Sequence, residues 1–429
     1  MLIIISDLHL IDGTAGTHHV PADAFKIFFE NISTSTKRLK EQGGEIQEIK
    51  LVFLGDLFEL LRTERWFDCP EDERPWGGNE HKIEEHANAV FDGVIMGNQD
   101  TFTMLKGNLK EQFDLVFEPE RIYIPGNHDR LCNKYESLRN KVCKWLKIPK
   151  RGAQPFEHSV ESIEYGVFAL HGHEYDKYNY EGGISYRYKD YMRVPIGDLI
   201  TTELVTRIAY VFKEKVQDLA LIPEEKEKLI KNFQEIDNVR PLAAVIEWLL
   251  YQVKRELTLK EIIEDSVEEV VKEFNSLEFV KRWYRHHDKW TDWWDEADVI
   301  QATLWLFENF KRFPSEVLLT FLERSAIILD LSEAASAEYS RLDSRIQYVV
   351  YGHTHEPAQV PIKVIETEGG KKEYTYLNTG SWGITHQKTM EGLGFMSCKN
   401  LRYAIFYKKE ERGKEFPPFE TWTGTLKTI

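Results

Sequence analysis

Short runs rich in large apolar residues recur along the chain, and polar residues of a similar kind follow each of them directly. The first three runs are Leu2 to Ile5, Lys50 to Leu54 and Arg121 to Ile124. Short apolar runs bounded by turn residues are typical of strands buried on both faces. Apolar residues at helical spacing occupy residues 21 to 42 and, with a break near Gly97-Asn98, residues 80 to 113. The pattern predicts an α/β fold.

A hairpin, Phe156 to Val160 and Tyr165 to Leu170, is predicted next, and strands return only after residue 345. The long stretch between is mostly helical by pattern, and a connection of that size is not a plain loop inside a compact fold. We therefore predict two parts of one core, residues 1–180 and 345–429, around an inserted helical domain, residues 181–344. The helices expected in the insertion are Thr201 to Lys215, Pro223 to Phe233, Leu242 to Lys254, Leu259 to Trp283, Asp298 to Lys311 and Glu316 to Ser332; the later strands are Ile346 to Tyr351, Gln359 to Thr367, Glu373 to Asn378 and Tyr403 to Lys408.

Composition restricts the class of protein. The 429 residues suffice for two or three domains, and a hydrophobic content of 42% with 13% aromatic residues is that of a folded chain. The net charge of -16 argues against non-specific wrapping of nucleic acid, although bound cations or a basic patch would still present a positive site to phosphate.

The beginning of the chain and its cysteines predict a cytoplasmic location. Met1 leads straight into Leu2 to Ile5 and then polar residues, without a basic segment, a long apolar segment or a small-residue cleavage site. No window approaches about 18 uninterrupted apolar residues, so no membrane span is expected. Four cysteines without paired spacing fit a reducing compartment and leave no cysteine-based metal site.

The candidate chemistry lies in five clusters, each after a predicted strand. A lone histidine is more often packed or solvated than a ligand, and an aspartate after a strand often caps the next helix. The repetition of acids, amides and imidazoles at five strand ends outweighs both alternatives, because ligands bind at the carboxyl edge of open α/β sheets. The clusters contain Asp7 and His9, Asp56 and Glu59, Asn127 and His128, His171 and His173, and His353 and His355.

This donor set suits divalent metals. Carboxylate, imidazole and amide without thiolate favour ions such as Mn, Fe, Zn, Co or Ni. A shared carboxylate, naturally Asp56, builds a dinuclear centre with ions about 3.5–4 Å apart that can hold a bridging hydroxide and clamp a phosphate. His128 is better placed as a proton donor to the leaving oxygen, with Glu59 or Asp56 orienting its ring.

The ordered blocks DLH, GDLFE, GNHD, HGH and GHTH resemble the calcineurin-like metallophosphoesterase superfamily over Met1 to His173 and Arg345 to Lys408. The resemblance implies two face-to-face β-sheets with helices outside, and a closing turn at Asn378 to Trp382. It implies two divalent metal ions, Mn first among them. One ion would be held by Asp7, His9, Asp56 and His355, and the other by Asp56, Asn127, His171 and His353, with His128 as general acid paired with Glu59.

Within that superfamily, the motifs DLHL and GDLFE are similar to those of members of the UDP-diacylglucosamine pyrophosphohydrolase type. Those members carry an arginine where this chain has His128, and their helical insert is much shorter, so no subfamily is assigned.

Several residues keep two interpretations. His173 is an alternative to His171 as ligand, or a residue that orients it. His18, His19, His386 and Arg130 are candidates for contact with a substrate phosphate or ordinary surface residues. The loop from residue 62 to 79, with Trp66 and Trp76, is either a substrate wall or packing. The same choice holds for the aromatic run of the insertion, which comprises Trp283, Tyr284, Trp290, Trp293, Trp294, Trp305 and Phe307; His286 and His287 within it are expected to be solvated.

The predicted function is hydrolysis of a phosphodiester, pyrophosphate or phosphomonoester by a dinuclear metal-dependent enzyme. A diester or pyrophosphate is favoured, because a proton donor at His128 helps most when the leaving group is a poor alkoxide. Nucleotides and nucleic acid remain among the substrate classes, and the insertion is a candidate platform for a protein partner. The competing hypothesis is a catalytically silent binding module that acts through the insertion.

Overall fold

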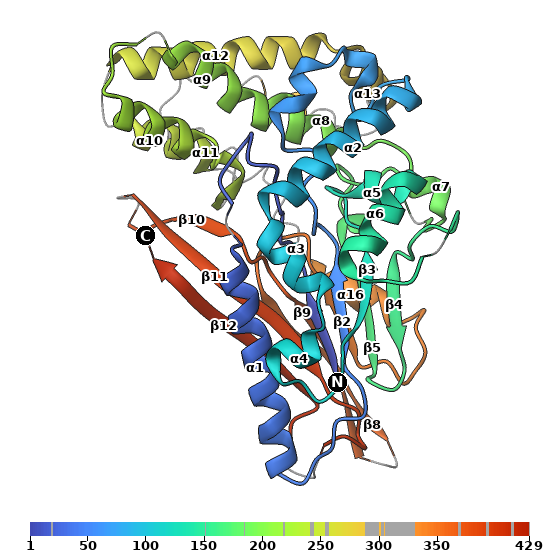
Figure 1. Ribbon diagram of the computed structural model, residues 1–429. Coiled ribbons are helices and arrows are strands. Elements are labelled where there is room, and N and C mark those ends of the chain that lie inside the picture. The colour runs from blue at the N-terminus through green and yellow to red at the C-terminus, as the bar shows by residue number, and fades with distance from the viewer. Residues whose placement is uncertain are drawn as a thin grey trace.

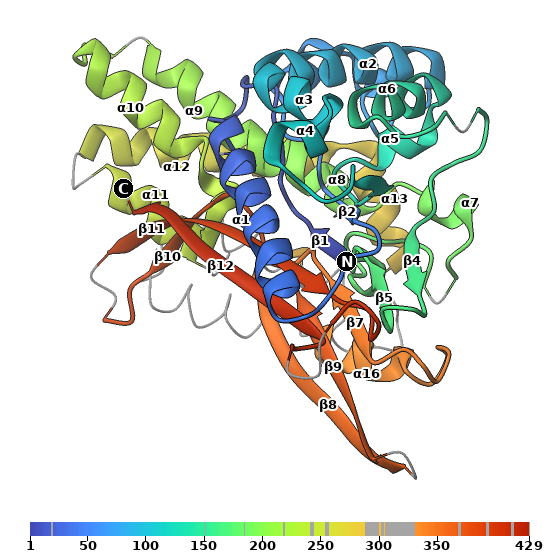
Figure 2. The same cartoon turned by 60° about the horizontal axis from the view of Figure 1, so that its bottom comes forward.

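Two β-sheets flanked by helices form a mixed α/β structure (Figures 1 and 2). The computed structural model describes residues 1–428 apart from 19, 151, 184, 218, 241–243, 254–256, 288–299, 302–303, 305–330, 368–369, 392–393 and 413–415. Within these residues, no helix is long and apolar enough to cross a membrane.

The larger sheet has the strand order β3-β2-β1-β11-β10-β6, with β12 beside β11. Strands β1, β2 and β3 run parallel, whereas β11 is antiparallel to β1, β10 and β12. The carboxyl ends of β1 to β3 therefore meet at one edge. The strands span Leu2–Ile5 (β1), Lys50–Leu54 (β2), Glu120–Ile124 (β3), Val239–Arg240 (β6), Ile384–Lys388 (β10), Phe395–Phe406 (β11) and Phe419–Thr428 (β12).

The smaller sheet, ordered β4-β5-β7-β9-β8, shares a core with the larger one. Side chains alternate along β1: Leu2 and Ile4 join this shared core, while Ile3 and Ile5 join the core beneath the outer helices. Burial on both faces explains why the strand is apolar throughout. The smaller sheet contains Ser159–Ser162 (β4), Val167–Leu170 (β5), Tyr348–Tyr351 (β7), Ala358–Thr367 (β8) and Gly370–Asn378 (β9).

Helices cover the outer faces of both sheets. The break expected near Gly97-Asn98 falls between α2 and α3, where the Asn98 side chain donates to the carbonyls of Ile11 and Val94. Both loop tryptophans are buried, Trp66 beneath the helices of the larger sheet and Trp76 in the core of the insertion. The covering helices are Ala22–Glu41 (α1), Glu80–Gly97 (α2), Gln99–Lys106 (α3), Leu109–Phe113 (α4), Arg130–Lys134 (α5) and Glu136–Leu146 (α6), with Leu331–Glu338 (α16) on the smaller sheet.

The predicted insertion contains helices that lie across the end of the sheets opposite the N-terminus (Figure 1). They pack around their own apolar core, which includes Phe212, Phe233 and Val270. The insertion also contributes β6, which pairs in parallel with β10 of the larger sheet. Its described helices up to residue 287 are Tyr188–Tyr191 (α7), Ile196–Leu199 (α8), a π-helical turn Ile200–Thr206, Arg207–Gln217 (α9), Pro223–Phe233 (α10), Val245–Gln252 (α11), Leu257–Ser276 (α12) and Glu278–His287 (α13). Helix α16 also falls within residues 181–344 but packs on the smaller sheet of the core. The two later predicted helices, Asp298 to Lys311 and Glu316 to Ser332, fall largely outside the described residues.

Phe28 provides a test of the outer core. Its ring is fully buried and packs against Trp382 and Tyr403, whereas Phe117 is 38% exposed. We expect Phe28→Ala to lower the free energy of unfolding by about 3–5 kcal/mol, because it removes a buried ring and leaves a cavity. Chemical denaturation measures the difference, and the matched Phe117→Ala change should cost less than about 1 kcal/mol. Equal losses in the two variants would contradict this packing.

Candidate metal centre

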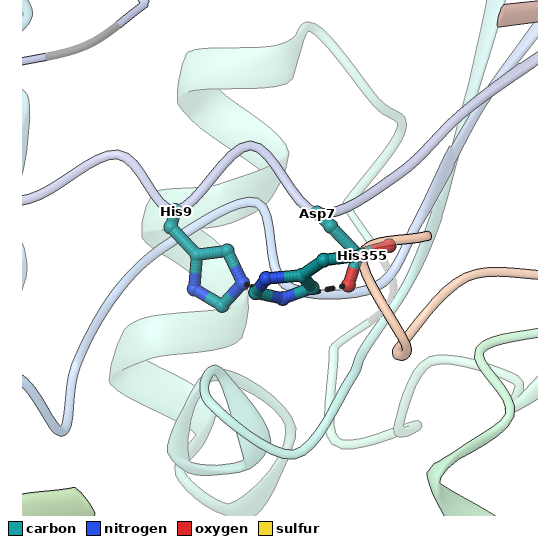
Figure 3. A group of neighbouring side chains, drawn as sticks. All are labelled: Asp7, His9 and His355. Atoms are coloured by element: carbon teal, nitrogen blue, oxygen red, sulfur yellow. Dashed lines mark hydrogen bonds and ion pairs between the residues drawn. The ribbon is translucent and has the colours of Figure 1, made fainter. Parts of the chain in front are cut away.

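All five polar clusters come together at one edge of the two sheets. Asp7 and His9 follow β1, Asp56 follows β2, Asn127 follows β3, and the remaining ligands follow β5 and β7. Within the described residues, three groups of side chains have ligand atoms that lie within 4.8 Å of one another. They are Asp7, His9 and His355 (Figure 3); His9, Asp56 and His128; and Asp56, His171 and His353.

Donor atoms in these groups have the spacing of ligands around shared cations. In the first group, His9 Nε2 and His355 Nε2 lie 2.9 Å apart, and His355 Nε2 lies 3.5 Å from Asp7 Oδ1 (Figure 3). In the third group, His171 Nε2 lies 3.1 Å from Asp56 Oδ2 and 3.2 Å from Asn127 Oδ1. Ligand atoms about 2.0–2.2 Å from one ion are separated by about 3–3.5 Å, so both groups fit a divalent cation.

Asp56 connects the two groups. Its Oδ2 lies 3.1 Å from His171 Nε2 and 3.8 Å from His9 Nε2. Its Oδ1 accepts a hydrogen bond from the backbone N–H of His128 (2.9 Å), which fixes the carboxylate between β2 and β3. This is the position that a bridging carboxylate needs.

The backbone at the site is strained. Within the described residues, seven non-glycine residues have a positive φ, and five of them are candidate ligands: Asp7, His9, Asp56, His353 and His355, with φ between 42° and 68°. Each such conformation costs on the order of 1 kcal/mol or more and concentrates at functional sites. The strain turns these side chains toward one another.

Two glycines let the strand ends approach closely. A Cβ atom on Gly55, whose φ is +81°, would lie 2.1 Å from His171 Nδ1, and a Cβ on Gly352 would lie 2.3 Å from Asp7 Oδ2. No side chain fits at either position. Glycine before the acid in one cluster and before the histidines in another is therefore a packing requirement of the site.

Three buried carboxylates make the site strongly acidic. Asp7, Asp56 and Glu59 are each at most 1% exposed. Burial, together with the charge of Asp56, raises the pKa of Asp7. Burial would also raise the pKa of Asp56, but the neighbouring His171 and His128 outweigh it and hold this pKa well below the usual range.

Glu59 orients two imidazole rings. Its Oε2 accepts hydrogen bonds from Nδ1 of His9 (2.9 Å) and Nδ1 of His128 (2.8 Å), and its Oε1 accepts two backbone N–H bonds from Leu61 and Arg62. Burial alone would lower the pKa of His128, but the charges of Glu59 and Asp56 raise it to about 10. His128 therefore holds a proton readily at neutral pH.

The geometry places His171, not His173, in a ligand group. His171 Nδ1 donates to the carbonyl of Leu54 (3.0 Å), which leaves Nε2 directed at Asp56 and Asn127. The His173 ring centroid lies 5.3 Å from that of His171, and its Nδ1 has no hydrogen-bond partner in the described part of the chain. Burial and the charge of His171 lower the pKa of His173 well below its usual value, which keeps it neutral.

Three supporting residues escaped the sequence prediction. Asp176 accepts a hydrogen bond from His353 Nε2 (3.0 Å), which leaves Nδ1 of that ring for a cation. Asn179 accepts from the Asn127 amide (3.2 Å), and Arg240 donates through Nη2 to Nδ1 of His355 (2.6 Å). The two acids that follow the HGH block, Glu174 and Asp176, were a usable signal for Asp176; Arg240 has none in its local sequence.

The other candidate phosphate contacts have structural partners. His386 stacks on Trp248, with centroids 4.2 Å apart, and Arg130 binds the buried Asp198. The His18 ring fills the space beside Gly97, where a Cβ would lie 2.5 Å from it. His19 falls outside the described residues.

Part of the aromatic run in the insertion is packed. Trp283 is 5% exposed, stacks on His287 and donates to Glu181, while Tyr284 packs beside it. The expectation of a solvated ring is confirmed for the exposed His286 and wrong for His287, which is half-buried between Trp283 and Glu181. Trp290, Trp293, Trp294, Trp305 and Phe307 lie outside the described residues.

No protein-family model matches the chain, and no significant match is found among curated proteins or solved structures. The case for a function therefore depends on the motifs and on the geometry of the site.

Gly55 allows a test of the centre with a matched control. Gly43 has the same φ of +81°, but a Cβ atom on Gly43 would have nothing within 4 Å of it. We expect Gly43→Ala to lose about 1–2 kcal/mol of stability from the left-handed backbone, and Gly55→Ala to lose more, because its methyl group also meets the buried His171 ring. Only Gly55→Ala should also weaken Mn²⁺ binding, by about tenfold or more, because its methyl group displaces His171. Calorimetric titration with Mn²⁺ measures this, and equal affinity in the two variants would contradict the assignment of His171.

Proposed function

We propose that the chain is a calcineurin-like metallophosphoesterase, a dinuclear metal-dependent hydrolase of phosphate esters. The observation that carries the proposal is the meeting of the five motif blocks, from strand ends far apart in sequence, in groups with metal-ligand spacing. Two sheets that share a core and carry helices outside are also what this superfamily requires.

Two divalent cations fit the donor set. Asp7, His9, Asp56 and His355 would hold one, and Asp56, Asn127, His171 and His353 the other. Mn is our first choice, with Fe, Zn, Co and Ni as ions of the same class, because the set combines carboxylate, imidazole and amide without thiolate. Bound cations would polarise a phosphoryl oxygen and lower the pKa of a water molecule toward neutrality.

The chain's own residues would contribute a proton donor, His128, placed to protonate the leaving oxygen. Hydrolysis breaks a P–O bond, and the departing oxygen needs a proton when it would otherwise leave as an alkoxide. His128 carries that proton on a ring whose Nδ1 is fixed by Glu59, so Nε2 is the nitrogen that donates. Glu59 also stabilises the protonated ring, since its carboxylate lies 2.8 Å away.

The presence of His128 favours a phosphodiester or pyrophosphate over a phosphomonoester. Nucleotides and nucleic acid are included in this class. A silent binding module needs neither a proton donor nor strained ligand loops, whereas this chain has both. Metal-dependent turnover distinguishes the two functions.

The central test is hydrolysis of bis-p-nitrophenyl phosphate and p-nitrophenyl phosphate by metal-stripped protein resupplied with Mn²⁺. We expect diester hydrolysis that requires the metal and falls in kcat in His128→Ala, because the leaving oxygen loses its proton donor. The loss should be about 10²-fold for a diester with an alkoxide leaving group and smaller for the nitrophenyl ester, because nitrophenolate is a weak base. His81→Ala, which removes an exposed histidine of α2, is the matched control and should leave kcat unchanged. Two equivalents of bound Mn²⁺ without turnover of either ester would favour the silent binding module, and failure to bind Mn²⁺ would exclude the metal-dependent phosphoesterase.

The pH dependence of kcat/KM tests the role of Glu59. The acid form of His128 exists below its pKa, and the Glu59 carboxylate raises that pKa. In Glu59→Gln the pKa should fall, so the alkaline limb of the profile should move to lower pH. The control Glu71→Gln changes an exposed acid and should leave the limb in place. An unmoved limb in Glu59→Gln would mean that another group supplies the proton.

A further inference from the structure

The segment from Gln234 to Arg240 joins the helical insertion to the core on two sides. Gln234 donates to the carbonyl of Thr14 (3.1 Å), and Arg62 donates through Nη1 to Asp237 Oδ2 (3.2 Å). Its last two residues form β6, which adds to the larger sheet beside β10. The core thus fixes this segment, and the insertion meets the metal centre at a set position.

Arg240, at the end of this segment, reaches the candidate ligands. Its Nη1 donates to the carbonyls of Asp237 (2.8 Å) and Val239 (2.9 Å), which fixes the guanidinium, and its Nη2 donates to His355 Nδ1 (2.6 Å). None of the ion pairs in the described part of the chain involves Arg240, and the nearby Asp237 carboxylate pairs with Arg62. The guanidinium is partly buried, and the charges of nearby carboxylates, chiefly Asp237, act on it without a direct bond in the described part of the chain. A bound anion would supply that direct charged partner.

The contact between Arg240 and His355 indicates which anion the guanidinium would bind. His355 Nε2 faces His9 and Asp7 on the ligand side of the ring (Figure 3). A histidine that holds a cation through Nε2 carries its proton on Nδ1, and that nitrogen then has no lone pair to offer. The guanidinium of Arg240 then needs another acceptor. A planar guanidinium binds phosphate oxygens well, so a phosphate bound at the cations could supply that acceptor.

We propose that Arg240 binds a phosphoryl oxygen of the substrate on the side of the centre formed by Asp7, His9 and His355. This assignment rests on the proposed phosphoesterase function and extends it: the insertion supplies a substrate-binding residue from a fixed strand. Substrate specificity then depends on the segment from Gln234 to Arg240, because a phosphate bound by Arg240 and the cations would lie between that segment and the ligands.

The test compares Arg240→Ala, Arg240→Lys and the control Arg285→Ala, which removes an exposed arginine of α13. Calorimetry measures two quantities for each protein: Mn²⁺ affinity and stoichiometry, and the affinity of the Mn²⁺-loaded protein for inorganic phosphate. We expect Arg240→Ala to weaken phosphate binding by about tenfold or more, with Mn²⁺ affinity within about twofold of wild type. Arg240→Lys should retain part of the phosphate affinity, because it keeps the charge and loses the fork, and the control should match wild type. KM for the diester should rise by a similar factor, with a smaller change in kcat.

Two outcomes would overturn the assignment. Unchanged phosphate affinity in Arg240→Ala, or a wild type that binds no phosphate, would show that Arg240 does not contact the anion. An equal fall in Mn²⁺ and phosphate affinity would show that Arg240 only holds His355. Failure of the proposed function looks different: phosphate binding that depends on Arg240 but is accompanied by no hydrolysis of either ester supports the Arg240 assignment and argues against catalysis.

Discussion

The carboxylates of Asp7, Asp56 and Glu59 are withdrawn from water where the strand ends meet, and an ionised carboxylate in such a place needs positive partners. The chain surrounds them with donors: the backbone N–H of His353 bonds Asp7, that of His128 bonds Asp56, and two rings bond Glu59. Imidazolium and N–H groups compensate part of the charge, and divalent cations bound at the candidate ligands would supply the rest. Because these donors come from the ends of β1, β3 and β7, this requirement explains why strands of both sheets end at the same edge.

The strain at the ligands depends on the rigidity of what lies beneath them. Left-handed backbone at Asp7, Asp56 and His353 persists only where the surroundings fix it. The strands that lead into these residues are buried on both faces, and their side chains interlock with the second sheet and with the outer helices. Apolar packing thus stabilises a geometry that the polar residues alone would not adopt. The positions of the candidate ligands are therefore fixed by the packed core beneath them.

The sequence was informative where a local pattern carries the structure. Apolar runs predicted β1 to β3 and β7, and the glycine-containing blocks predicted which residues meet, because a strand end specifies the direction of the next side chain. It missed β6, which has two residues and no period, and also β10 and β12. It also missed Arg240, whose contact with His355 spans 115 positions and follows from the pairing of β6 with β10. Such residues depend on tertiary placement, which no local pattern encodes.

Charge decides how such a protein would bind its substrate. A net charge of -16 repels phosphate at long range, but salt limits that repulsion to about 8–10 Å. At short range the buried acids would repel phosphate as well unless bound cations exceed their negative charge, so in the proposed function the metal ions would serve substrate binding as much as the chemistry. Arg240 adds positive charge on the side of His355, where it opposes the negative charges of Asp237, Glu356 and Asp7. An acidic protein could therefore bind an acidic substrate, since the field that matters is set within a few ångströms of the candidate ligands.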